Sequence, residues 1–469
     1  MSTIFATALL ALPLPVFQSE QAIAPEVEAY RSTVSAILSE ALVNGQTYKK
    51  LESLIEVAPH RLSGSPGAAA AVEWARQAML ADGLENVRLE PCMVTHWERG
   101  KTERLRVVGP PELAGVELPI LALGGSIATA EHGLIAEVIE VQNFEELRAL
   151  GDKAKGKIVF FNRPMDATLL STFPAYGGAV GQRVNGAVEA AKVGGVAAIV
   201  RSMTTRLDDF PHTGGMRYAE GVTKVPTAAV STRGAELISD LLEKGETVRL
   251  HLELDCKSFP NAPSFNVVGE LVGHESPEEV VVLGGHLDCW DVGQGAHDDG
   301  GPCCQTVEAV RILKKLNLRS RRTLRVVLFM NEENGLGGAN AYYDAYKDQM
   351  QNHVFAIESD SGAFTPRGFR SDAGPKAMAV LRDIVTLFEG TGGERMYVGG
   401  GGADVSPMKK SGVITASYLP DSQRYFDLHH SARDTIAEVS PRELELGAGL
   451  ITALVYVIAD LEQPLHKLD

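Results

Sequence analysis

The C-terminal half of the chain alternates between short apolar runs and longer amphipathic segments. From residue 262 onward, VVVLGG, LRVVLFM, VFAIES and VITASYL are each followed by a segment whose apolar positions have helical spacing. The last such segment, ELGAGLITALVYVIADLEQ, is apolar over most of its length. Continuous apolar strands alternating with helices are typical of a mostly parallel sheet with helices on both faces. The sequence therefore predicts an α/β fold for this half.

The rest of the chain has two other patterns. Residues 25–90 show helical spacing, interrupted by the loop-like HRLSGSPGA, and residues 86–108 alternate as strands do. Residues 118–255 are rich in Gly, Ala and Val and hold short strand-like pieces around one helix-like stretch. We therefore expect 118–255 to form a β/α domain inserted into a discontinuous main domain of residues 25–117 and 256–469.

Residues 1–22 resemble a secretory signal peptide, with an apolar run followed by polar residues. No Lys or Arg precedes the apolar run, and no Ala-x-Ala cleavage site follows it. The run is too short and too interrupted by proline to span a membrane, and no later segment reaches spanning length. We expect an exported protein, secreted or periplasmic.

Composition narrows the class of protein further. A chain of 469 residues is too long for one ordinary core, which agrees with two domains. The net charge of -16 and the lack of a Lys/Arg-rich block argue against a nucleic-acid partner. The five cysteines are an odd number and too few for a disulfide scaffold, so we expect them to pack as small apolar side chains.

Side chains that bind metals follow the predicted strands repeatedly. In chain order they are His286, Asp288, Asp298, Glu332, Glu333, Glu358, Asp360, His429, His430 and Asp434. In a parallel sheet these strand ends meet at one edge, where imidazoles and carboxylates together need cations to neutralise them. Such a set without thiolates suits zinc or another borderline divalent ion. Two ions fit better than one, because the set offers five good ligands, and one carboxylate can bridge two metals about 3.5–4 Å apart.

The order of these motifs resembles the zinc exopeptidases with two co-catalytic metals, a metallopeptidase family that includes aminopeptidases and glutamate carboxypeptidase. The motifs are HLD at 286–288, DDGG at 298–301, NEEN at 331–334, ESDSG at 358–362 and HSARDT at 430–435. RLSGSPGA, ENVRLEP and HWERG add likeness to the glutamate carboxypeptidase members. GKIVFFN, GGVAAIVRS, PHTGG and VPTAAVS are similar to the protease-associated domain inserted in those enzymes. The resemblance covers nearly the whole chain after the leader.

The resemblance implies a ligand for each position of a site with two zinc ions, or two other divalent ions. Asp298 would bridge the two metals. His286 and Asp360 would complete one site, and Glu333 and His430 the other.

The resemblance also implies roles for the neighbouring side chains. Glu332 would be the general base for a water between the metals, which divalent ions acidify. Asp288 would orient the first histidine ligand, and Asp434 the second. His429 would donate a hydrogen bond to the oxyanion of the tetrahedral intermediate.

Three residues leave alternatives open at this stage. His297 lies directly before the bridging carboxylate and could compete as a ligand, and the sulfur of Cys289 could coordinate metal as well. Glu358 lies two residues from Asp360 in an extended chain, so spacing alone does not choose between the two carboxylates.

The predicted function is hydrolysis of short unblocked peptides by a metallo-exopeptidase of carboxypeptidase or dipeptidase type. The alternatives are an aminopeptidase of the same family, a non-catalytic binding or receptor protein on this fold, and a different hydrolase or acyl-transferring cyclase on this scaffold. An arginine would bind the free C-terminal carboxylate of a peptide, and an acidic group would bind a free N-terminal amine. The candidate arginines are Arg201, Arg217, Arg424 and Arg433. A homodimer is implied by the resemblance alone.

Overall fold

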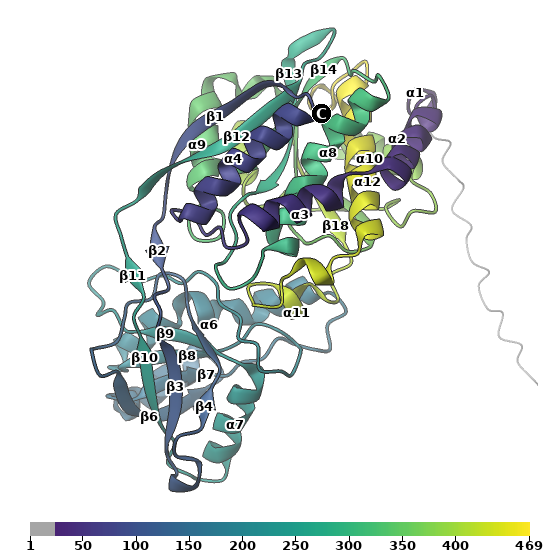
Figure 1. Cartoon of the computed structure of the whole chain (residues 1–469). Helices are drawn as coiled ribbons and strands as arrows, with labels where there is room; N and C mark the ends of the chain where they lie inside the picture. The colour runs from purple at the N-terminus through teal and green to yellow at the C-terminus, as the bar shows by residue number, and fades with distance from the viewer. Residues whose placement is uncertain (1–23) are drawn as a thin grey trace, which may run out of the picture.

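The computed structural model describes residues 24–469, which form two α/β units joined by a pair of chain crossings (Figure 1). The signal peptide predicted for residues 1–22 lies outside the described residues. Among the helices of residues 24–469, none has both the length and the apolar character needed to cross a membrane.

The main domain is built on a sheet of eight strands. In the order in which they pair, they are β1 (Glu85–Val94), β12 (Ala262–Leu271), β14 (Arg322–Phe329), β13 (Ser276–His286), β15 (His353–Glu358), β18 (Thr415–Pro420), β16 (Pro366–Ser371) and β17 (Met396–Val398). The central strands β14, β13, β15 and β18 are parallel, whereas β12 and β16 run antiparallel to their inner neighbours. The predicted α/β fold is confirmed, with a sheet that is mixed at its edges.

Helices cover both faces of this sheet. They are α1 (Pro25–Glu28), α2 (Arg31–Asn44), α3 (Thr47–Val57), α4 (Pro66–Ala81), α8 (Gly301–Lys315), α9 (Gly337–Tyr346), α10 (Pro375–Thr386) and α12 (Pro441–Asp460). The short helix α11 (Tyr425–Leu428) lies between the two units instead. Successive residues of β13 point to opposite faces. Val281 and Leu283 pack in the cluster that contains α8 and α12, while Val280 and Val282 pack with Tyr342 of α9. The apolar run of β13 is therefore buried on both sides.

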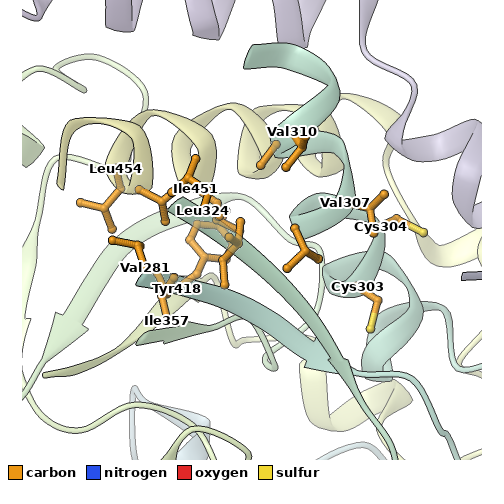
Figure 2. Packing of buried hydrophobic residues seen from close by; sticks show 14 of the residues in the cluster. Val281, Cys303, Cys304, Val307, Val310, Leu324, Ile357, Tyr418, Ile451 and Leu454 are labelled. Carbon is orange, nitrogen blue, oxygen red and sulfur yellow. The ribbon is translucent and has the colours of Figure 1, made fainter. Parts of the chain in front are cut away.

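The larger core lies between the sheet and helices α8 and α12 (Figure 2). The labelled side chains are Val281, Cys303, Cys304, Val307, Val310, Leu324, Ile357, Tyr418, Ile451 and Leu454, all buried. Cys303 and Cys304 are fully buried in α8, and all five cysteines are free. They pack as small apolar side chains, as the composition predicts.

The second unit contains its own sheet of eight strands. In pairing order they are β4 (Glu117–Leu118), β3 (Glu103–Gly109), β10 (Arg249–Leu254), β6 (Leu134–Val141), β7 (Ile158–Phe161), β8 (Ala197–Arg201), β9 (Thr227–Val230) and β5 (Ile120–Ala122). Its helices are α5 (Phe144–Leu150), α6 (Thr172–Lys192) and α7 (Thr232–Glu243).

The chain passes between the two units at β2 (Trp97–Glu98) and β11 (Lys257–Ser258), which pair with each other. We call residues 99–256, between these strands, the inserted unit. The sequence places the first boundary at residue 118, yet β3 lies before that residue and pairs with β10 of the inserted unit. Strand alternation over 86–108 does not tell which sheet each strand joins.

Two apolar clusters hold the inserted unit against the main domain. Phe426 and Leu428 of α11 share a cluster with Ala175 and Ala179 of α6. Trp290 of the main domain lies in the other cluster, together with the strands of the inserted unit. Because both clusters border the carboxyl edge of the main sheet, the junction between the units lies beside the predicted site.

Candidate metal centre

The carboxyl ends of the parallel strands bring the predicted ligands together. His286 is the last residue of β13, Glu333 follows β14 and Asp360 follows β15. Asp298 lies in the turn before α8, and His430 lies just after α11. The five side chains come from five separate segments, and the α/β topology alone places them at one edge of the sheet.

The carboxylate of Asp298 lies between the two histidines. Its Oδ1 is 3.3 Å from Nε2 of His286, and its Oδ2 is 3.3 Å from Nε2 of His430. Nε2 of His286 is also 3.4 Å from Oδ1 of Asp360, and Nε2 of His430 is 3.0 Å from Oε2 of Glu333. Each histidine thus faces two carboxylates, and Asp298 is shared.

These separations fit tetrahedral zinc. Ligand bonds of about 2.0–2.1 Å at tetrahedral angles place two donor atoms of one zinc ion about 3.3 Å apart. A histidine that gives up its Nε2 proton offers a lone pair there, and a cation can take the place of that proton between the imidazole and the carboxylates. Oε1 of Glu333 is buried without a hydrogen-bond partner, so it too has a free lone pair. The residues present therefore fit a pair of divalent ions.

The pKa shifts of the clustered side chains also favour a site for cations. Burial alone would raise the pKa of Asp298, but hydrogen bonds from His286 and His430 lower it well below the usual range. Burial would lower the pKa of His430, but Glu333 and Asp298 raise it to about 10. The pKa of Glu333 is raised to about 7, chiefly by burial. The clustered carboxylates therefore favour positive charge beside them, which bound cations would supply.

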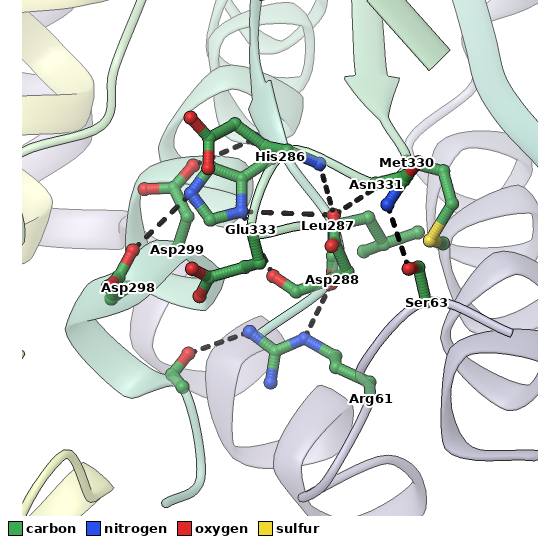
Figure 3. Close-up of polar contacts among 12 residues, drawn as sticks. Arg61, Ser63, His286, Leu287, Asp288, Asp298, Asp299, Met330, Asn331 and Glu333 are labelled. Atoms are coloured by element: carbon green, nitrogen blue, oxygen red, sulfur yellow. Dashed lines mark hydrogen bonds and ion pairs between the residues drawn. The ribbon is translucent and has the colours of Figure 1, made fainter. Parts of the chain in front are cut away.

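Asp288 supports two parts of the site at once (Figure 3). Its carboxylate accepts hydrogen bonds from the N–H groups of Asn331, at 2.7 Å, and Glu332, at 3.1 Å. Its backbone carbonyl accepts a hydrogen bond from Nδ1–H of His286 at 3.0 Å, which turns Nε2 toward the metal ligands. The prediction was that the Asp288 side chain orients His286, but its carboxylate is 4.0 Å from Nδ1, and the backbone carbonyl accepts the hydrogen bond instead.

Asp434 differs from the prediction that it orients His430. Its Oδ1 accepts hydrogen bonds from the N–H groups of Ala296 and His297, and its Oδ2 from that of Asp298. Asp434 therefore fixes the turn that carries Asp298. Sequence spacing suggested the wrong target, because the contacts of Asp434 are with the backbone of a distant segment.

The structure also decides the three open alternatives. The ring of His297 stacks on Phe364 at 4.2 Å and uses both nitrogens in backbone hydrogen bonds, so it is no ligand. Sγ of Cys289 faces the Pro59 carbonyl. Glu358 accepts a hydrogen bond from the N–H of Val405 and does not contact His286, which leaves Asp360 as the carboxylate at that ligand.

The loop HRLS at residues 60–63 forms hydrogen bonds with the segments that carry the predicted ligands (Figure 3). The fully buried guanidinium of Arg61 donates to the carbonyls of Leu287, Gln294 and Gly295, within the segment that connects the first two ligands. Ser63 accepts a hydrogen bond from Nδ2 of Asn331, next to the predicted general base. One loop therefore positions both sides of the site.

A cavity of about 360 Å³ opens over the ligands. It is lined by Phe173, Tyr176, Arg183, Gly215, His286, Asp298, Glu332, Glu333, Asp360, Tyr425, Phe426, His429 and His430. Four of these, from Phe173 to Gly215, belong to the inserted unit, so the cavity lies between the two units.

Arg183 is the arginine in this cavity, and sequence reasoning missed it. The four arginines considered from the sequence do not line the cavity, whereas Arg183 does. Its position in the middle of α6 carries no motif. Its one available signal is the spacing of seven residues from Tyr176, which puts both on one helix face, and its guanidinium donates to the Tyr176 hydroxyl at 2.7 Å.

The fold and the clustered donors are typical of a metallopeptidase. The chain belongs to peptidase family M28, whose family model matches residues 266–455. It is 38% identical to carboxypeptidase Q of Bos taurus, over 97% of this chain and 94% of that protein. It is 37% identical to carboxypeptidase Q of Homo sapiens, over 94% and 92% respectively. The resemblance found in the motifs is confirmed, and the protein is a metallopeptidase.

Solved structures agree with this assignment. The crystal structure of a peptidase M28 precursor from Shewanella amazonensis has a TM-score of 0.89 at 32% identity, covering 94% of this chain and 98% of that one. A zinc aminopeptidase from Bacillus subtilis shares the fold, with a TM-score of 0.65 at 19% identity and coverage of 90% and 97%.

The role of Arg61 leads to a prediction about metal affinity. Arg61→Lys removes the planar fork and leaves buried carbonyls without donors, at a cost of about 1–3 kcal/mol for each unsatisfied group. Since those carbonyls lie between His286 and Asp298, we expect zinc affinity to fall about 10- to 100-fold. Zinc titration against a competing chelator measures it.

Arg322 offers a matched control. It is 4% exposed and also donates to backbone carbonyls, those of Ala459, Leu461 and Glu462, away from the metal ligands. Arg322→Lys should lower the melting temperature without changing zinc affinity. Equal zinc affinity in the two variants would contradict the positioning role of Arg61.

Proposed function

We propose that the protein is a di-zinc exopeptidase that hydrolyses short peptides with a free C-terminal carboxylate, in the manner of a carboxypeptidase or dipeptidase. The observation that carries the proposal is the buried guanidinium of Arg183 in the same cavity as the metal ligands. Membership of family M28 and the likeness to carboxypeptidase Q support the same class of substrate.

The proposed ligand sets share one carboxylate. His286, Asp298 and Asp360 would hold one zinc ion, and His430, Glu333 and Asp298 the other. When bound, the two ions supply Lewis acidity that acidifies a water molecule and polarises the scissile carbonyl. The donor spacing near 3.3 Å supports this assignment.

Glu332 is the proposed general base. Its side chain lines the cavity, and its carboxylate accepts no hydrogen bond from the residues that the structure describes. Burial raises the pKa of Glu332 well above the usual range, so the carboxyl can hold a proton taken from water. It then delivers that proton to the leaving amine as the carbon–nitrogen bond breaks.

His429 is the proposed donor to the oxyanion. Its Nε2 is 3.8 Å from Oδ2 of Asp298, and its ring stacks on His430 with centroids 3.5 Å apart. Burial lowers the pKa of His429 well below the usual range, so the ring is neutral and carries one N–H. A neutral imidazole beside the ligands can stabilise developing negative charge by donating that N–H.

Arg183 is the residue proposed to bind the C-terminal carboxylate of the substrate. It is 6% exposed, and its Nε is buried without a hydrogen-bond partner. Among the cavity-lining residues Arg183 is the one Lys or Arg, and every carboxylate there already belongs to the ligand set or to Glu332. No acidic group of the lining is left for a free amine, which favours a carboxypeptidase over an aminopeptidase.

Two further inferences concern the rest of the chain. We infer that the inserted unit is of the protease-associated type, which its four similar motifs support, and that the protein is exported, which the apolar leader supports.

The general base can be tested by Glu332→Gln, which keeps the shape of the side chain and removes its basicity. We expect kcat to fall about 10²- to 10⁴-fold, the usual contribution of general acid–base catalysis. Zinc content should stay at the wild-type level, measured by elemental mass spectrometry. Glu56→Gln, on the exposed face of α3, is the matched control. A kcat within threefold of wild type would remove Glu332 from this role.

Recognition of the free C-terminal carboxylate can be tested with one peptide in four forms: free, N-acetylated, C-amidated and doubly blocked. A carboxypeptidase cleaves the free and acetylated forms, and a dipeptidase the free form alone. Arg183→Gln should raise KM for the free peptide about 10- to 100-fold, because hydrogen bonds to charged groups contribute about 1.5–3 kcal/mol. Mass spectrometry of the products and initial rates give both results.

Arg217→Gln is the control, because Arg217 is exposed on the same unit and donates to Asn185. Cleavage of the free and amidated forms alone would show an aminopeptidase and refute this reading. No cleavage of any form by protein with two zinc ions bound would refute the peptidase proposal for this substrate class.

A further inference from the structure

A segment of the inserted unit pairs directly with the loop that carries the second histidine ligand. The N–H of Thr213 donates to the carbonyl of His430 at 2.9 Å. In return, Nδ1–H of His430 donates to the carbonyl of Thr213 at 3.3 Å. The neighbouring His212 donates from Nδ1–H to the carbonyl of His429 at 2.6 Å. Three hydrogen bonds therefore cross between the units at the metal site.

These contacts determine how His430 presents itself to a metal. A histidine ligand needs one nitrogen protonated and held, so that the other nitrogen has its lone pair in a fixed direction. With Nδ1–H bound to Thr213, Nε2 points to Asp298 and Glu333. The backbone of His430 has a φ of 59°, in the left-handed region that non-glycine residues seldom occupy, so neighbouring contacts have to hold it.

The two histidine ligands differ in where this support comes from. Nδ1 of His286 is bound by the carbonyl of Asp288, two residues further along the same loop of the main domain. Nδ1 of His430 is bound by a residue of the inserted unit. The first site is therefore complete within the main domain, and the second site is not.

The supporting segment is itself fixed inside the inserted unit. The N–H of His212 donates to Oγ of Ser202 at 2.9 Å, and Oγ1 of Thr213 donates to the carbonyl of Ala122 at 2.7 Å. His212 and Thr213 are 1% and 0% exposed. Burial lowers the pKa of His212 to about 4, so the ring is neutral and its one proton lies on Nδ1.

Aromatic contacts hold the inserted unit and the main domain in this relative position. Tyr176 of α6 stacks on Phe426 of α11, with ring centroids 4.6 Å apart, directly beside the histidine loop. This packing keeps the segment at residues 212–213 close to the ligand loop, where the three hydrogen bonds fix the position of His430.

We propose that the inserted unit completes the second metal site, with His212 and Thr213 acting as positioning residues for His430. The inference rests on the proposed pair of zinc ions and adds that one of them depends on both units. Loosening this contact weakens the second site and leaves the first intact.

The test is a zinc titration of the full-length variant His212→Ala against a competing chelator. We expect two zinc equivalents on the wild type. In the variant, the first should bind as before and the second about 10- to 100-fold more weakly, as is usual when a residue that orients a ligand is lost. His212→Asn, whose amide can donate where Nδ1–H does, should restore much of the second site. Thr213→Val, which loses the hydroxyl bond to Ala122, should also weaken it.

His353 provides the matched control. It is 3% exposed, its pKa is also lowered to about 4 by burial, and both ring nitrogens form hydrogen bonds, with Tyr342 and Gln349. It lies at the start of β15, whereas the ligands lie beyond the end of that strand. His353→Ala should lower the melting temperature and leave both zinc affinities unchanged.

The outcomes separate this inference from the proposed function. Suppose that the wild type binds two zinc ions and that folded His212→Ala and Thr213→Val bind the second ion as tightly as the wild type does. That result would overturn this inference and leave the proposed function standing. Equal weakening in His353→Ala would overturn it as well, since the effect would then be one of general stability. Fewer than two zinc ions on the wild type would overturn the two-ion proposal beneath it.

Discussion

The structure depends on one buried carboxylate that serves two imidazoles at once. Asp298 is 5% exposed and lies 3.3 Å from a nitrogen of His286 on one side and of His430 on the other. Burying such a charge is costly unless it is fully compensated, and a small displacement would unbalance it. Much of the surrounding structure therefore serves to hold this side chain, its two histidines and their remaining carboxylates in place.

Three supports come from segments far apart in the sequence. Arg61 binds the carbonyls between His286 and the bridging turn, Asp434 binds the backbone N–H groups of that turn, and Thr213 binds the ring of His430. All three act through the backbone of at least one partner, so each needs the fold to be formed first. Preorganisation of this kind is what a site needs to hold reacting groups within tight limits.

The clustering of the predicted ligands could be foreseen because His and carboxylate side chains stand at the ends of strands that run parallel. His286, Glu333 and Asp360 follow apolar runs, and the parallel arrangement of those runs brings them to one edge. Backbone contacts leave no such signal, so the target of Asp434 was predicted wrongly. Arg183 was missed because no motif surrounds it in the middle of α6. The α/β class followed from apolar periodicity, whereas the assignment of β3 to the second sheet depends on long-range pairing that alternation does not encode.

The central claim is that two zinc ions lie on either side of the Asp298 carboxylate. The direct measurement is anomalous diffraction at the zinc edge from crystals of the zinc-loaded protein. The account predicts two peaks about 3.5–4 Å apart, one beside His286 and the other beside His430, with Asp298 between them. A single peak, or a second peak away from His430, would contradict it.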